Sequence, residues 1–137
     1  FITESTDYDA NYHLIEDNPF KQKLLKLSLS NHFDLLLDFH GLSDSHNFDF
    51  GFFFKNRFSK SMRIAADIKS FIESGLLKGA LTQVLKFNRD PQEEISDFGV
   101  SELKIPSIQI EVARYIRGDF ALREEFIKNM ANYISSF

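Results

Sequence analysis

The stretch FDLLLDFHG, residues 33–41, decides the fold class of this chain. Residues 33–39 are nearly continuous in apolar character and too few for a typical helix. This pattern predicts a strand buried on both faces, as in the central sheets of α/β proteins. The strand is expected to end at His40-Gly41, where the glycine lets the backbone turn.

Helical and strand patterns alternate on either side of this stretch. Capping residues and apolar periodicity predict helices over 19–30, from Ser59 or Ser61 to Gly75, over 90–103, and after Asp119. Further strands are expected at 48–54, 81–87 and 107–112. The order α-β-β-α-β-α-β-α predicts one layered α/β domain over 1–137, with a mostly parallel or mixed central sheet flanked by helices. The last helix is expected to place Phe120, Phe126, Ile127, Met130 and Ile134 on one apolar face.

Composition narrows the function classes. The 137 residues include 16 Lys+Arg and 20 Asp+Glu, a formal net charge of −4, so a basic footprint for nucleic acid or for membrane lipid is missing. No nucleic-acid or membrane partner is therefore expected. There is no cysteine, so any metal would be held by His, Asp or Glu. Cysteine-free composition also fits a reducing compartment, and we expect a cytoplasmic location.

His40 and Asp38 are the first candidate site residues. Functional side chains of open α/β sheets lie just past the carboxyl ends of the strands, and His40 occupies that position. Its imidazole could bind a metal or act as an acid or base. Asp38 lies two residues earlier on the same strand face, where it could orient an imidazole. The alternative is a structural histidine that bonds a backbone carbonyl.

Glu111 is the second candidate, because it follows the apolar run 108–110 of an expected central strand. A carboxylate in such a place is usually paired or used, and it could act as a general base on water. The alternative is a structural ion pair with Arg114 or Arg117. Arg57 and Arg114 adjoin the expected strand ends and could bind a substrate carboxylate bidentately.

The segment LLLDFHG at 35–41 resembles the strand-ending D-x-H-[SG] segment of the N-formylglutamate amidohydrolase family, and IPSIQIE at 105–111 resembles that family's I-P-x-x-Q-x-E segment. The resemblance covers roughly 19–117. It implies a zinc hydrolase of carboxypeptidase-like fold, with His40 as a zinc ligand and Glu111 as the general base. It implies cleavage of the amide bond of a small N-formyl or N-acyl amino acid, with Arg57 or Arg114 holding the substrate carboxylate.

The earlier metal-binding motif of that family has no counterpart before His40, and the chain begins at Phe1. We therefore expect the C-terminal portion of a longer hydrolase, whose remaining zinc ligands lie upstream. A sheet edge left open by a missing half would favour a homo-oligomer. The alternative function is a non-enzymatic α/β binding or scaffold module without a complete metal site.

Overall fold

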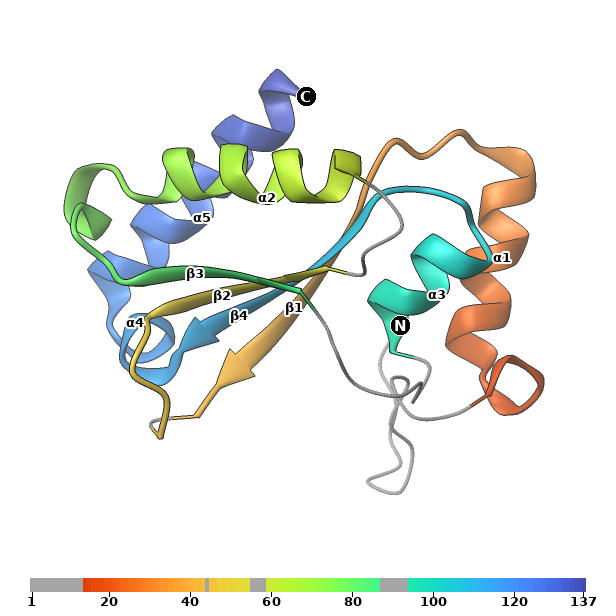
Figure 1. Ribbon diagram of the computed structural model, residues 1–137, viewed down its shortest axis with the longest axis horizontal. Helices are drawn as coiled ribbons and strands as arrows, with labels where there is room; N and C mark the ends of the chain where they lie inside the picture. The colour runs from red at the N-terminus through yellow and green to blue at the C-terminus, as the bar shows by residue number, and fades with distance from the viewer. Residues whose placement is uncertain (1–13, 44, 55–58, 87–93) are drawn as a thin grey trace.

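The computed structural model describes residues 14–43, 45–54, 59–86 and 94–137 (Figure 1). In these ranges one mixed sheet has the strand order β1-β4-β2-β3. β1 and β4 are parallel, β2 and β3 are parallel, and β2 runs antiparallel to β4. The predicted layered α/β class, with a mixed sheet and flanking helices, is confirmed. The strands are β1 (Leu36–Leu42), β2 (Phe50–Phe54), β3 (Thr82–Lys86) and β4 (Ser107–Ala113).

Helices cover both faces of the sheet. α2 and α5 pack on one face, and α3 packs against β1 and β4 on the other, as Figure 1 shows. None of the helices in the described ranges combines the length and apolar character needed to cross a bilayer. The helices are η1 (Ile15–Asp17), α1 (Pro19–Ser30), α2 (Ser59–Ile72), η2 (Gly75–Leu77), α3 (Ile95–Ser101), α4 (Arg114–Gly118) and α5 (Phe120–Ser136).

Two helices begin where their capping residues predict. The Asn18 side chain accepts a hydrogen bond from the backbone N–H of Lys21 at 3.0 Å, and Pro19 is the first residue of α1. The Asp119 carboxylate accepts from the backbone N–H of Leu122 at 3.0 Å at the start of α5. Each side chain satisfies a donor that the helix itself leaves unpaired. The bounds of α1 agree with the predicted 19–30.

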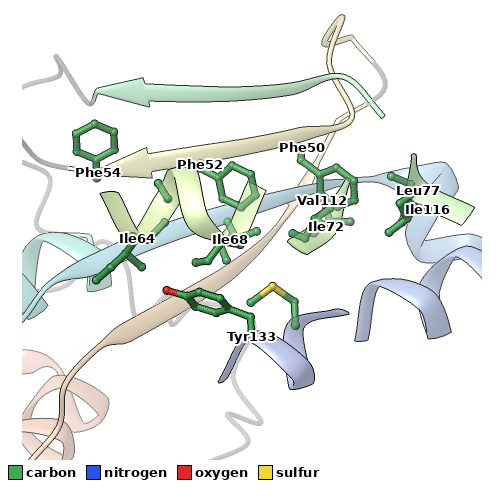
Figure 2. Packing of buried hydrophobic residues seen from close by; sticks show 14 of the residues in the cluster. Phe50, Phe52, Phe54, Ile64, Ile68, Ile72, Leu77, Val112, Ile116 and Tyr133 are labelled. Atoms are coloured by element: carbon green, nitrogen blue, oxygen red, sulfur yellow. The ribbon is translucent and has the colours of Figure 1, made fainter. Parts of the chain in front are cut away.

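The main core lies between the sheet and the pair α2 and α5. Alternate side chains of β2 (Phe50, Phe52 and Phe54) are almost entirely buried in the main core, and Figure 2 shows the Phe52 ring against α2. They meet one apolar face of α2, which carries Ile64, Ile68 and Ile72 (Figure 2). The phenylalanine-rich segment around β2 is therefore core, because the two-residue period of a strand aligns every second ring with the helix.

The predicted first strand is wrong in its bounds and in its burial. β1 begins at Leu36 rather than Phe33 and continues through His40 and Gly41 to Leu42. It is also an edge strand, and Phe39 is 51% exposed. An apolar run does not distinguish an edge strand from a central strand, because the neighbours of a strand in the sheet are set by pairing with distant parts of the chain.

The predicted apolar face of the last helix is partly wrong. Met130 is buried and Phe126 is half-buried, whereas Phe120, Ile127 and Ile134 are exposed. Tyr133 and Asn129 are buried instead.

Other helix and strand bounds also differ from prediction. Among the described residues α3 covers Ile95–Ser101 and ends two residues before the predicted end at 103, while the Asp90-Pro91 cap lies outside the described residues. The short helix α4 was not predicted.

Candidate functional site

Four polar side chains form what we call the polar ladder: Asp38 and His40 on β1, and Gln109 and Glu111 on β4. The parallel register places Asp38 beside Gln109 and His40 beside Glu111. Residues two apart on a strand share a face, and neighbouring strands lie about 4.8 Å apart. All four side chains therefore belong to one face, the one opposite the main core. The structure thus brings together the two residues that the sequence put at neighbouring strand ends.

His40 and Asp38 interact directly. His40 Nε2 lies 3.0 Å from Asp38 Oδ2, and the two side chains are only 27% and 14% exposed. Apart from this ionic contact, Asp38 Oδ2 has no hydrogen-bond partner among the described residues. The Asp38 contact raises the pKa of His40 above 6.5, with further raising by the charges of Glu111 and Glu94, while burial acts in the opposite direction. The imidazole is thus held toward its protonated form.

Glu111 is held by its neighbour on the same strand. Gln109 Nε2 donates a hydrogen bond to Glu111 Oε1 at 3.0 Å. Gln109 is 5% exposed, and its Oε1 is buried with no hydrogen-bond partner in the described part of the chain. The bond to Glu111 fixes which end of the carboxamide donates, so the remaining oxygen is available only as an acceptor.

Arg117 forms hydrogen bonds to the backbone at the carboxyl ends of both β1 and β4. Its Nε donates to the carbonyl of Val112 at 2.9 Å, and its Nη2 donates to the carbonyl of Leu42 at 3.3 Å. The guanidinium lies so close to Gly41 that a Cβ there would sit 2.8 Å from Arg117 Cζ. The hydrogen bonds of this arginine thus go to backbone carbonyls, whereas one sequence-based alternative paired it with Glu111.

Aromatic rings flank the polar ladder on its β2 side. Gly51 is the β2 partner of Glu111. A Cβ on Gly51 would lie 2.5 Å from the Phe53 ring and 2.9 Å from the Phe48 ring. The glycine therefore allows two rings to pack over the backbone next to Glu111.

The two candidate arginines, and two histidines outside the site, are less informative. Arg57 lies outside the described residues. Arg114 is exposed at the start of α4, directly after β4. His32 pairs on the surface with Asp34 at 3.1 Å, and the His46 ring lies 5.3 Å from that of Phe48.

Sequence reasoning missed Gln109 and Glu94 as members of the site. Gln109 could have been found, because it stands two residues before Glu111 and must share its face of the strand. Glu94 could not, because it acts on His40 from the start of α3, more than fifty residues along the chain.

The donor side chains near His40 decide whether the polar ladder could hold zinc. No group of three His, Asp or Glu side chains that could hold a metal ion occurs among the described residues. Catalytic zinc generally takes three protein ligands. The described part of the polar ladder therefore does not by itself make a zinc site, and the zinc ligand role of His40 stays a prediction.

Comparisons with protein-family models, with curated proteins and with solved structures found no match to this chain.

Proposed function

We propose that the polar ladder is a hydrolytic site that cleaves the amide bond of a small N-formyl or N-acyl amino acid. The observation that carries this proposal is the register of His40 with Glu111 on adjacent parallel strands. A proton donor and a proton acceptor side by side are what amide hydrolysis requires. The substrate class comes from the sequence resemblance described above.

The two side chains take complementary roles. Glu111 removes a proton from water, and the water oxygen attacks the carbonyl carbon of the substrate. His40, whose pKa is raised by Asp38, donates its proton to the leaving nitrogen as the C–N bond breaks. The products are a carboxylic acid and a free amino acid. Asp38 keeps the imidazole oriented and protonated, and Gln109 holds the Glu111 carboxylate in place.

Zinc, as the resemblance implies, would polarise the carbonyl and activate the water. Because the described residues do not form a complete set of ligands, no step above depends on it. Arg114 and Arg57 remain candidates for the substrate carboxylate.

Site-directed variants test the proposal. His40→Ala and Glu111→Gln are each expected to lower hydrolysis of N-formyl amino acids by about 100-fold or more, as for the loss of a general acid or base. His32→Ala is the matched control, because His32 is an exposed histidine paired with an aspartate at 3.1 Å. Assays with and without added zinc, alongside elemental analysis, measure the metal requirement. Equal activity in His40→Ala and the unmodified chain would contradict the proposal.

A second candidate is a non-enzymatic binding or scaffold module. It is favoured by the large apolar side chains that α5 leaves exposed, including Phe120 at 70%. Absence of hydrolysis at every zinc concentration, together with no bound metal, would support the module over the enzyme.

A further inference from the structure

Three large apolar side chains form a row on the exposed side of α5. Phe120, Ile127 and Ile134 are 70%, 52% and 55% exposed. They are seven residues apart, and seven residues make nearly two full helical turns, so the three lie almost in line. We call this row the outer stripe.

The outer stripe cannot turn into the core. Met130 and Tyr133 of the same helix already pack there, beside the α2 residues of the main core. Tyr133 also contacts Phe71 of α2 edge to face, with ring centroids 5.4 Å apart. Single exposed apolar residues are common on protein surfaces, whereas several large apolar side chains aligned on one helix indicate an interaction surface.

We propose that the outer stripe binds the outer stripe of a second copy of this chain, with the two α5 helices antiparallel. A two-fold axis at Ile127 places Phe120 of each copy against Ile134 of the other copy. The stripe is self-complementary in this arrangement because Phe120 and Ile134 are equally far from Ile127 along the helix.

Charges beside the stripe favour the antiparallel direction. Glu124 and Lys128 lie on the same flank of the stripe, and both are exposed. In the antiparallel pair, Glu124 of each copy lies about 3 Å along the axis from Lys128 of the other. Two symmetric ion pairs result. In a parallel pair the two-fold axis would run along the helices and would place the two charged flanks on opposite sides of the interface, so neither ion pair could form.

Lys128 can exchange its present contact for this one. Its Nζ donates to Glu125 Oε2 of the same helix at 3.4 Å, and its side chain is 65% exposed. A change of rotamer would bring it to the second copy. Such exposed pairs act mainly on orientation and specificity, while the apolar stripe provides most of the affinity.

The size of the stripe sets the expected affinity. Stable dimers bury about 800 Å² per partner, which three side chains and their neighbours on one helix reach only in part. The dimer is therefore expected to be weak, and a concentration series is needed to observe it.

Sedimentation and light scattering over a concentration series test the proposal. The unmodified chain is expected to change from monomer to dimer, and Ile127→Glu is expected to weaken the dimer by about 30-fold or more, because the two-fold axis buries the new charge twice. Leu29→Glu is the matched control, since Leu29 is 83% exposed on α1 and should leave the dimer unchanged. Circular dichroism confirms that each variant is folded.

Variants that reverse the charges of Glu124 and Lys128 test whether the two α5 helices are antiparallel and whether the partner is a second copy of the chain. Glu124→Lys and Lys128→Glu are each expected to weaken the dimer by about three-fold or more, and the double variant to recover it. A monomer at every concentration would overturn the proposal. So would a dimer unaffected by Ile127→Glu, which would place the contact elsewhere, for example at the β1 edge.

Discussion

Replacing Asp38 by asparagine is expected to change the dependence of stability on pH. The folded-state pKa of His40 lies above its ordinary value of 6.5, mainly because of Asp38. A raised pKa means that protonated His40 stabilises the fold. This contribution is fully present below pH 6.5 and is lost as the pH rises through the folded-state pKa.

The size of the effect follows from burial. A hydrogen bond or ion contact with a charged partner contributes about 1.5–3 kcal/mol when it is protected from water. The side chains of His40 and Asp38 are 27% and 14% exposed, so solvent weakens the contact. We therefore expect Asp38→Asn to lower the free energy of unfolding by about 1–2 kcal/mol at low pH, and by less at high pH. Some pH dependence remains, because Glu111 and Glu94 also raise the pKa.

Urea unfolding of the unmodified chain and of Asp38→Asn at about pH 5.5 and about pH 9 measures how the loss of stability depends on pH. The control is Asp34→Asn, which removes the same kind of contact from His32, at 3.1 Å, where the two side chains are 87% and 61% exposed. It is expected to change stability by less than about 0.5 kcal/mol at either pH. The reasoning is refuted if Asp38→Asn has the same effect at both pH values, or if the two variants behave alike.

Two further pairs of variants test packing. Phe52→Ala is expected to cost about 3–5 kcal/mol in urea unfolding, because the ring is fully buried, whereas Phe39→Ala on the exposed edge should cost less than half as much. Gly99→Ala is expected to destabilise by about 1–3 kcal/mol despite the better helix propensity of alanine, because its Cβ would overlap the Ser107 hydroxyl and come within 3.0 Å of Ser107 Cβ. A Cβ added at Gly118 would meet no atom within 4 Å, so Gly118→Ala should be neutral or stabilising. An equal loss of stability in both glycine variants would contradict the role given to close packing.

Local signals made the helix starts predictable. Asn18 and Asp119 cap their helices through hydrogen bonds to backbone groups three residues away. Such contacts depend only on neighbouring residues, so they can be read from the sequence alone. The same is true of the alternation in β2, where every second phenylalanine enters the core.

The candidate site was predictable in part. His40 and Glu111 were chosen because each closes an apolar run, and the structure pairs them across two strands. Their roles stay predictions. The ion contact of His40, the hydrogen bond to Glu111 and the position of Arg117 involve side-chain directions that no residue pattern specifies.

Sequence alone determined the order of the main helices and strands, although not the short helix α4, since periodicity and capping are local properties of the chain. Only tertiary structure decided that β1 lies at the edge of the sheet, that its polar side chains face those of β4, and that α5 leaves Ile127 and Ile134 outside the core. The physical reason is that burial and register depend on partners distant in the chain. A strand or an amphipathic helix carries its apolar residues wherever it packs, and the neighbouring elements select which of them are covered.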